Sequence, residues 1–390
     1  MTTPPPTALV IGAGIAGLAS AIALERAGFS VRVVDRAPVL APMGAALSIW
    51  ANAVDALDQL GVGPALRDQG TRIDQMAVFR RDGRSVIGPR QVNDSPYPGA
   101  RSYMVTRAAL QSILLAAIDP ACLTLGVAMK EITHDAGGVS VQLDTGTSIS
   151  GDIAIIADGI WSSQAGAMLG GKPRHAGYGG VLALSDPVAG ELGAHAAHEY
   201  WGLGARFGVF DIGAGRRYWF YMRNEADSAE ARLLTHAQIA DTAQDWMPEI
   251  GAAIAATPAD RLIPFSIHAK PPPTRLGKGR ILCVGDAAHA MEPNLGQGAC
   301  QAIEDAVALG VIAATRPVSA IVDGVERLRL KRIAHYVKQS AEGARASHSR
   351  SALTRGVLKV ALGMAPAALT NRVISGMYKL PDYAALARGG

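Results

Sequence analysis

The chain has 390 residues, of which 49% are hydrophobic and 18% charged, and its formal net charge is +4. This composition is typical of a globular protein with a sizeable core, and the length favours two domains. No apolar run reaches the roughly 20 residues of a transmembrane helix, and the N-terminus lacks the basic region of a signal peptide. Its cysteines are few, widely spaced and without a CxxC pair, which argues against a disulfide framework or a zinc site and fits a reducing cytoplasm. They are Cys122, Cys283 and Cys300.

A dinucleotide-binding unit is predicted at the start of the chain. A strand at 8–11 is followed by the glycine turn Gly12-Ala-Gly14-Ile-Ala-Gly17 and a helix at 18–27. A second strand at 31–34 then ends in the acidic residue Asp35. Gly12 makes the turn, Gly14 lets a pyrophosphate approach, and Gly17 lets the helix pack on the strand. Asp35 stands where the partner of a ribose hydroxyl belongs. The pattern favours nucleotide binding over a coincidental glycine-rich turn, and it leaves NAD and FAD both open.

Three stretches further along the chain carry related patterns. Arg107 opens an amphipathic helix, and a buried strand over 153–157 ends in Asp158-Gly159. A second apolar run over 281–284 stops at Gly285-Asp286, and a loop with three glycines or prolines leads into a helix over 299–309. Because that helix begins behind glycines, its uncovered N–H groups and the positive end of its dipole favour an anionic, flat group.

Residues 72–89 and 177–223 alternate between apolar and polar positions, which predicts half-buried antiparallel strands. His195 and His198, followed by Glu199, have the spacing of a helix face but do not form an HExxH motif, so no metal site is predicted. His289 is a tempting base, although a structural role is favoured for it. No GxSxG motif is present, which argues against the common serine hydrolases.

Between residues 326 and 379 the chain is strongly basic, with eleven Lys or Arg against two Glu. A solvated helical face is the favoured interpretation. Nucleic-acid binding is disfavoured because no aromatic interleaving or binding module accompanies the charge. A weak membrane-surface contact stays open, because apolar faces at 357–364 and 373–377 lie beside these charges.

In this combination the chain resembles the FAD-dependent aromatic hydroxylases, single-component flavoprotein monooxygenases built on the fold of para-hydroxybenzoate hydroxylase. The likeness runs from about residue 7 to about residue 340, and the pattern is most similar to the quinolone and urate hydroxylases of this family. The resemblance implies tightly but non-covalently bound FAD.

The resemblance assigns a set of residues to the cofactor: Gly12, Gly14, Ile15, Ala16, Gly17, Asp35, Arg36, Gly44, Ala45, Arg107, Asp158, Gly159, Gly285, Asp286, Pro293, Gly296, Gln297 and Gly298. It implies that Asp286 meets the ribityl hydroxyls and that residues 44–52 and 293–298 flank the isoalloxazine. The arginine that usually closes the second fingerprint, which begins at Asp158-Gly159, is replaced by Ala165. This departure concerns the pyridine nucleotide rather than FAD.

Two residues of the predicted sheet are similar in spacing and surroundings to those of the urate and quinolone hydroxylases: Arg206 and Tyr218. The resemblance implies that both face the substrate and take part in catalysis. The alternatives are a surface-pairing arginine and a core tyrosine whose hydroxyl is satisfied within the protein.

The resemblance also implies the chemistry. NAD(P)H, docking transiently, would reduce FAD, and O₂ would then give a flavin C4a-hydroperoxide whose oxygen passes to an electron-rich aromatic or heteroaromatic small molecule. Epoxidation of an alkene by the same peroxide stays open. So do a flavin-dependent dehydrogenase or reductase without oxygen insertion and a flavoprotein without enzymatic activity.

The expected fold class is α/β: a Rossmann-like FAD-binding domain interrupted by a mainly antiparallel β-sheet substrate domain, with C-terminal helices. The FAD-binding domain is expected in three parts, at 1–72, 101–176 and 266–340, the substrate sheet in two, at 73–100 and 177–265, and the helices at 341–390. A cytoplasmic monomer or homodimer without a nucleic-acid partner is expected.

Overall fold

The computed structural model describes residues 4–40, 44–91, 102–188, 192–226, 229–349 and 377–389. The apolar tail segments at 357–364 and 373–376, to which a membrane contact was tied, lie outside these ranges. Within the described part of the chain, no helix is both long and apolar enough to cross a membrane.

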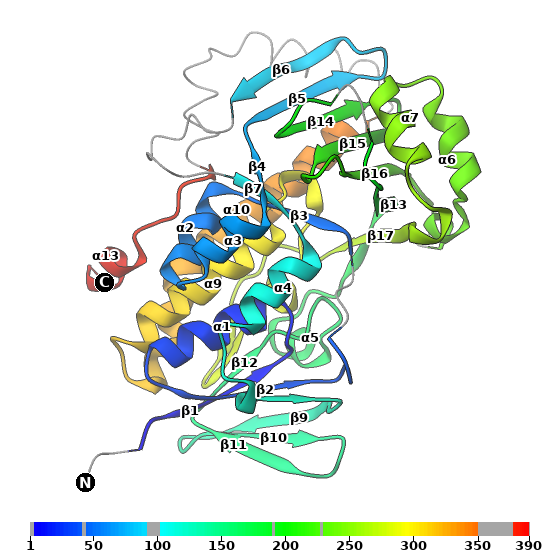
Figure 1. Ribbon diagram of the computed structural model, residues 1–390. Helices are drawn as coiled ribbons and strands as arrows, with labels where there is room; N and C mark the ends of the chain where they lie inside the picture. Colours follow the sequence, from blue (N-terminus) through cyan, green and yellow to red (C-terminus); the bar gives the residue numbers. More distant parts are fainter. Residues whose placement is uncertain are drawn as a thin grey trace.

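A six-stranded sheet lies in the lower half of the view in Figure 1. Its order is β18-β19-β12-β1-β2-β8, and every pair is parallel except the pairing of β18 with β19. The strands are β1 (Thr7–Ile11), β2 (Ser30–Asp35), β8 (Leu123–Leu125), β12 (Ile153–Ile156), β18 (Gly277–Lys278) and β19 (Ile281–Cys283). Because β1, β2 and β12 are parallel, their carboxyl ends meet at one edge, where ligands of such sheets bind.

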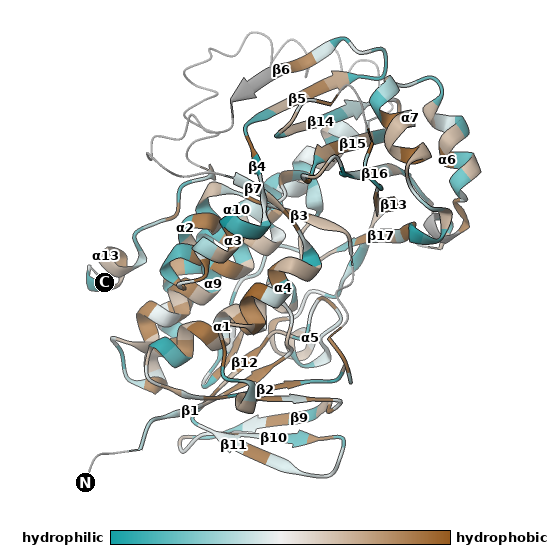
Figure 2. Cartoon of the chain, in the orientation of Figure 1, coloured by the Kyte–Doolittle hydropathy of each residue, from teal (hydrophilic) through white to brown (hydrophobic). Residues whose placement is uncertain are grey.

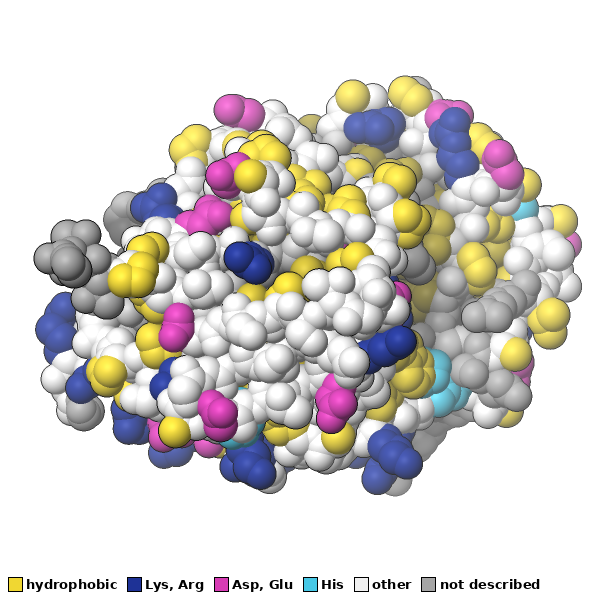
Figure 3. All heavy atoms as spheres, turned by 90° about the horizontal axis from the view of Figure 1, so that it is seen from below, with side chains coloured by type: hydrophobic (Ala, Val, Ile, Leu, Met, Phe, Trp, Pro, Cys, Tyr) yellow, Lys and Arg dark blue, Asp and Glu magenta, His cyan; other side chains and the backbone are white. Residues whose placement is uncertain are grey.

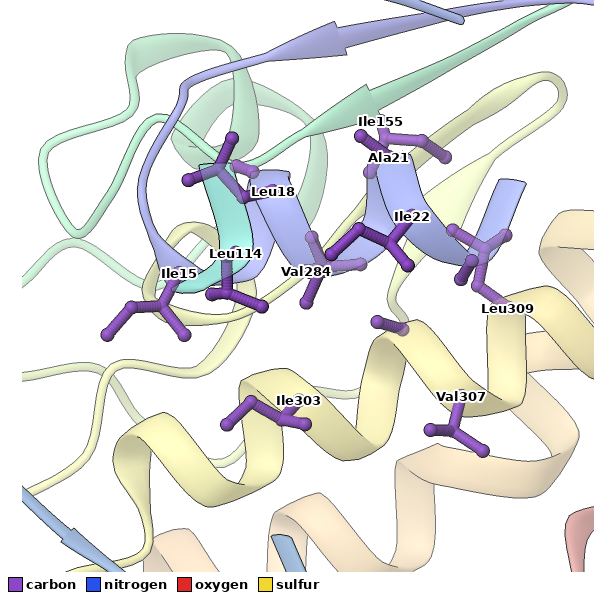
Figure 4. Close-up of a cluster of buried hydrophobic side chains, with 14 of the residues drawn as sticks. Ile15, Leu18, Ala21, Ile22, Leu114, Ile155, Val284, Ile303, Val307 and Leu309 are labelled. Carbon is purple, nitrogen blue, oxygen red and sulfur yellow. The ribbon is translucent and has the colours of Figure 1, made fainter. Parts of the chain in front are cut away.

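The main core lies between this sheet and two helices, α1 (Ile15–Arg26) and α9 (Gly298–Ala313). Figure 4 shows Ile22 of α1 and Ile155 of β12 on one side of the cluster, with Ile303 and Val307 of α9 on the other. Burial of each such side chain stabilises the fold by about 1.5–3 kcal/mol. Apolar residues also dominate α1, α9 and the parallel strands in the hydropathy view (Figure 2). The glycine turn and the N-terminus of α9 are therefore fixed by one continuous core.

A seven-stranded, mainly antiparallel sheet lies above the first in Figure 1. Its order is β17-β13-β16-β15-β14-β5-β6, and only β14 and β5 pair in parallel. The strands are β5 (Gln75–Arg80), β6 (Ser85–Gln91), β13 (Arg174–Leu184), β14 (Ala196–Trp201), β15 (Ala205–Asp211), β16 (Arg217–Asn224) and β17 (Ile263–Ala269). The expected α/β class, with a parallel sheet and a second, mainly antiparallel one, is confirmed.

Side chains alternate between the two faces of this second sheet, so that one face packs in a core and the other lines a cavity. In β15, Phe207 and Val209 join a second core with Trp219 of β16 and with helices α6 (His236–Ala243) and α7 (Pro248–Ala255). Arg206 and Phe210, at the alternate positions of β15, point to the other face, as do Tyr218 and its alternating neighbours in β16. The side chains of that other face line a cavity.

The remaining elements complete the shell. Two three-stranded sheets consist of β3 (Ala46–Ile49), β7 (Ser102–Thr106) and β4 (Thr71–Ile73), and of β9 (Met129–His134), β10 (Val139–Leu143) and β11 (Ser148–Gly151). The helices are α2 (Ala51–Gln59), α3 (Gly63–Gln69), α4 (Arg107–Leu115), α5 (Ser163–Leu169), α8 (Asp286–His289), α10 (Ile321–Ser347) and α13 (Tyr383–Arg388). Short 3-10 turns lie at Pro120–Cys122, Glu230–Leu233, Ala259–Arg261, Pro293–Leu295 and Val318–Ala320.

Three local predictions are wrong. The first helix begins at Ile15 rather than at residue 18, so Gly17 lies inside it. His198 and Glu199 lie on strand β14 and not on a helix. The basic segment is not a uniformly solvated face, because Arg329 of α10 is fully buried against carboxylates of α9. Figure 3 shows basic and acidic side chains interspersed over the face that it draws.

Candidate active site

A cavity of about 840 Å³ joins the edge of the parallel sheet to the inner face of the seven-stranded sheet. Most residues assigned to the cofactor line it, together with both residues assigned to the substrate. They are Gly12, Gly14, Ile15, Ala16, Asp35, Arg36, Arg107, Asp158, Gly159, Asp286, Pro293, Gly296 and Gly298, with Arg206 and Tyr218. The remaining five do not line it: Gly17, Gly44, Ala45, Gly285 and Gln297.

The glycine turn after β1 leaves room for a ligand only because of its residue types. Gly12 has φ +108°, and a Cβ there would lie 2.5 Å from the carbonyl oxygen of Ala157. A Cβ at Gly17 would lie 1.8 Å from the carbonyl oxygen of Gly12, so Gly17 is needed for packing. Nothing lies within 4 Å of a Cβ at Gly14, which faces the cavity at the N-terminus of the 12-residue helix α1. The turn can therefore receive a pyrophosphate.

Asp35 stands beside this turn at the end of β2. Its Oδ2 accepts a hydrogen bond from the amide of Ala13 at 2.7 Å, and its Oδ1 accepts one from Ala37 at 2.8 Å. Each carboxylate oxygen has a further lone pair for a ribose hydroxyl. The carboxylate is thus held in place before a ligand arrives.

Helix α4 supplies two side chains to the cavity. Thr106 caps the helix by accepting from Ala109, and the amide of the next residue, Arg107, donates to the carbonyl of Ala45 at 3.1 Å. One turn later, Gln111 donates to the carbonyl of Ala13 at 3.1 Å and also lines the cavity. Sequence reasoning missed Gln111, although its place four residues after Arg107 puts both on one helix face.

Asp158 and Asp286 bring carboxylates to the edge of the parallel sheet. The Oδ1 atom of Asp158 is buried and has no hydrogen-bond partner among the described residues. Burial raises the pKa of Asp158, while hydrogen bonds and the charges of Arg36 and Lys270 act in the opposite direction. Asp286 is exposed to the cavity as the first residue of α8. Acceptors of this kind fit the hydroxyl-rich part of a dinucleotide such as FAD.

The loop before α9 forms the middle of the cavity. Gly296 adopts a left-handed conformation with φ +61°, and Gly298 begins a helix of 16 residues whose N-terminus lines the cavity. The Gln297 side chain, by contrast, is fully buried and bonds to Asn52 and Gln301. The positive end of α9 therefore points at the cavity, and the Gln297 side chain is not available for a ligand there.

A buried ion network joins α9 to α10 and to the residues around α8. Arg329 Nη1 donates to Glu304 at 2.6 Å and its Nε to Asp305 at 2.8 Å. The other oxygen of Asp305 accepts from the amide of Gly285 at 3.1 Å and lies 2.6 Å from His289 Nε2. His289 is 1% exposed and does not line the cavity, so its position fits the structural role.

Arg206 lies at the far end of the cavity, 2% exposed. Its Nη2 donates to Asn294 Oδ1 at 2.6 Å, its Nη1 lies 3.4 Å from Glu199 Oε2, and its Nε has no partner among the described residues. The guanidinium carbon is 5.5 Å from the centre of the Phe220 ring. Arg206 is therefore not a surface-pairing arginine.

Tyr218 lies on β16, next to the β15 strand that carries Arg206, and Phe210 pairs with it across the ladder. Burial raises the pKa of Tyr218, and the positive charge of Arg206 partly opposes this effect. The hydroxyl thus stays protonated and can act as a donor. The surrounding wall is largely apolar, with Leu47, Met76, Phe210, Phe220, Met222, Met291 and Leu295.

Asn294 connects this end of the cavity to the loop before α9, and the sequence analysis did not single it out. Besides accepting from Arg206, it donates to Tyr178 Oη at 2.9 Å and to the carbonyl of Ser340 at 3.0 Å. Tyr178 donates in turn to Glu292 at 2.9 Å. The only sequence signal for Asn294 is its place inside the segment 293–298.

Comparisons with known proteins agree with this geometry. A family model described as "FAD binding domain" matches residues 6–317. The chain is 33% identical to the FAD-dependent urate hydroxylase of Klebsiella pneumoniae over 357 residues, covering 88% of this chain and 91% of the relative. It is also 33% identical to the aurachin C monooxygenase/isomerase of Stigmatella aurantiaca over 307 residues, covering 78% and 79%. The structure of Klebsiella pneumoniae HpxO complexed with FAD and uric acid matches with a TM-score of 0.85 at 29% identity, covering 98% of this chain and 97% of that one. The chain therefore belongs to the FAD-dependent aromatic hydroxylases and is an FAD-dependent monooxygenase.

Proposed function

We propose that the protein uses NAD(P)H and O₂ to hydroxylate an electron-rich aromatic or heteroaromatic small molecule, through a flavin C4a-hydroperoxide. The observation that carries the proposal is one continuous cavity, in which the glycine turn, Asp286 and the N-terminus of α9 are joined to a pocket with a buried arginine. When bound, the flavin supplies electron transfer from the nicotinamide and activation of oxygen.

The cofactor end is proposed to bind FAD through fixed groups. The N–H groups at Gly14 and the following turn of α1 would hold the pyrophosphate, Asp35 a ribose hydroxyl and Asp286 the ribityl chain. Arg107 and Asp158 would contact the flavin half of the cofactor. The N-terminus of α9 at Gly298 would stabilise negative charge on the ring, because its donors are oriented before the charge develops.

At the substrate end, Arg206 would bind an anionic or carbonyl oxygen of the substrate. Its Nε and the less tightly bonded Nη1 are the donors available for this contact. Tyr218 would donate from the neighbouring strand, so that two donors orient a ring whose faces meet Phe210 and Phe220. Orientation of this kind lowers the entropic cost of bringing the ring to the reactive oxygen. The apolar wall excludes water, which would otherwise release the activated oxygen as peroxide.

The proposed substrates are phenols, urate-like purines and quinolones, tested with the purified FAD-loaded protein. Addition of a true substrate should raise both NADH or NADPH oxidation and O₂ uptake, with a product one oxygen atom heavier. Oxidation of NAD(P)H with O₂ uptake but no oxygenated product from any of these classes would overturn the substrate assignment. Substrate conversion without O₂ uptake would indicate a dehydrogenase instead, and a product oxygenated at an alkene an epoxidase.

A further inference from the structure

The indole N–H of Trp50 lacks a hydrogen-bond acceptor among the described residues, whereas those of Trp201 and Trp219 have one. Trp50 joins β3 to α2 and is 4% exposed, yet its indole N–H is buried without an acceptor in the described part of the chain. Trp201 donates to Glu199 at 3.0 Å, and Trp219 donates to Thr257 at 2.8 Å. A buried indole N–H normally has a partner, because losing its hydrogen bond to water is costly.

The unpaired donor belongs to the wall of the cavity. Trp50 lines the cavity beside the loop before α9, where a Cβ on Gly296 would lie 2.6 Å from the indole nitrogen. Gly296 is thus required twice, for its left-handed φ and for the close approach of the indole. The donor therefore lies beside the loop that is proposed to flank the flavin.

Tyr378 fixes the orientation of the indole from the C-terminal end of the chain. The two rings are stacked with centroids 4.9 Å apart and planes at 29°, and Tyr378 also lines the cavity. Such stacking removes the rotational freedom that an isolated indole would have. The N–H direction is consequently set before a ligand binds.

The segment that carries Tyr378 is held on α10 and α9 by hydrogen bonds on both sides of this residue. Tyr336 Oη donates to the carbonyl of Met377, and Arg332 Nη2 donates to that of Lys379 at 2.9 Å. Further on, Tyr383 Oη donates to Glu304 at 2.7 Å. Tyr378 is thereby held in the cavity wall, although it follows Trp50 by more than three hundred positions in the chain.

We propose that Trp50, oriented by Tyr378, donates a hydrogen bond from its indole N–H to an acceptor oxygen or nitrogen of a bound aromatic ring system. Two ring systems can supply that acceptor, the polar edge of the flavin and the oxidisable ring of the substrate. The substrate alternative rests on the function proposed above. Trp50 is then a ligand-binding residue and Tyr378 a positioning residue.

The direct test is the ¹⁵N–¹H resonance of the Trp50 indole, assigned by its loss in Trp50→Phe. It is recorded in apoprotein, in FAD-loaded protein and in FAD-loaded protein with urate or a 4-quinolone. We expect a downfield proton shift and slower exchange with water, at the FAD step if the flavin is the acceptor and at the probe step if the substrate is. An indole proton with the same shift and exchange rate in all samples would overturn the proposal.

Affinities provide the second measurement. Trp50→Phe keeps the ring and removes the donor, and should weaken the ligand whose addition shifts the resonance about tenfold, equal to about 1.4 kcal/mol. Trp246→Phe is the control, because Trp246 packs against Phe207 and does not line the cavity, and it should leave both affinities unchanged. Tyr378→Ala should weaken the same ligand as Trp50→Phe. Trp50→Phe affinities within about twofold of wild type for FAD and both probes would contradict the proposal.

The failures of the two proposals are distinguishable. An indole shift on FAD addition, without NAD(P)H-dependent O₂ consumption with any probe, would remove the proposed function and leave this hydrogen bond in place. Normal hydroxylation with an unchanged indole resonance would support the proposed function and overturn the Trp50 hydrogen bond.

Discussion

Arg206 Nη2 donates to Asn294 Oδ1 at 2.6 Å, a contact between the substrate end of the cavity and the loop that leads into α9. Asn294 is itself fixed by Tyr178 and by the carbonyl of Ser340. Any movement of the guanidinium therefore acts on the loop that is proposed to flank the flavin. Five predictions follow from this arrangement and from the buried groups around it.

Asn294→Ala should release Arg206 from its fixed orientation while leaving FAD bound. A hydrogen bond to a charged group contributes about 1.5–3 kcal/mol, so we expect at least a tenfold loss of kcat/KM and a lower ratio of product to NAD(P)H consumed. Asn224→Ala is a matched control, because Asn224 bonds to the carbonyl of His348 and does not line the cavity. Equal kcat/KM and coupling ratios in the two variants would remove the positioning role of Asn294.

Arg206→Ala and Tyr218→Phe should both reduce substrate affinity and coupling without loss of FAD. Arg206→Lys should not restore the wild-type values, because an ammonium lacks the planar set of donors of a guanidinium. The exposed Arg216, in the turn before β16, provides a control as Arg216→Ala. Unchanged product formation per NAD(P)H in Arg206→Ala and Tyr218→Phe would show that neither residue binds substrate.

Asp286→Ala should weaken FAD binding at least tenfold, or about 1.4 kcal/mol, because it removes an acceptor for the ribityl hydroxyls. The residue is exposed, so folding should be unaffected. The fraction of protein that keeps its yellow colour after gel filtration measures the effect. Asp323→Ala, an exposed change at the start of α10 and away from the cavity, should keep FAD. An Asp286→Ala protein that stays fully yellow would contradict the assignment.

Arg329→Met should lower the free energy of unfolding by about 3–5 kcal/mol, because it removes the buried guanidinium that pairs with both Glu304 and Asp305. Urea unfolding monitored by tryptophan fluorescence gives the value. Arg327→Met changes an exposed residue of the same helix and should alter it by less than about 0.5 kcal/mol. Similar losses in both variants would mean that the network does not stabilise the fold.

His348 predicts a dependence of stability on pH. Burial, and then the charge of Arg206, lower the pKa of His348 to about 3, against an ordinary value of 6.5. Above the ordinary value the residue is neutral in both states and contributes no pH dependence. Between the two values the unfolded chain takes up a proton that the folded chain excludes, so stability falls as the pH is lowered through this window.

The pH dependence of the unfolding free energy that His348 causes can be separated from the part caused by the buried carboxylates. His348→Asn should lessen the fall in unfolding free energy between about pH 6.5 and pH 4, by up to roughly 1.4 kcal/mol per pH unit. A variant with the wild-type slope would show that His348 does not titrate in this way.

The sequence predicted those parts of the site that local backbone geometry defines. Gly12 and Gly296 have positive φ, and Asp35 ends a strand, so turn chemistry and periodicity suffice to find them. The alternating pattern likewise predicted strands for Arg206 and Tyr218, which lie on the neighbouring β15 and β16, whereas their shared pocket was implied only by the family resemblance. The roles of these residues in binding stay predictions until they are tested.

Residues whose roles depend on tertiary contacts could not be found in this way. Arg329 looks like any charge on a basic helix until α9 brings Glu304 and Asp305 to it. Tyr378 has no motif around it and reaches the cavity only because α10 holds the preceding and following carbonyls. Gln297 carried a cofactor assignment by its place in a motif, although its side chain turns into the protein.

The central claim is that the cavity activates O₂ and passes one of its atoms to an aromatic ring beside Arg206. The most direct measurement is the mass spectrum of the product formed by FAD-loaded protein with NAD(P)H, a phenol, urate or quinolone substrate, and isotopically labelled O₂. The account predicts one labelled oxygen atom on the ring of the product, and little such product from Arg206→Ala. A ring oxygen that comes from water, or substrate recovered unchanged while NAD(P)H is consumed, would contradict it.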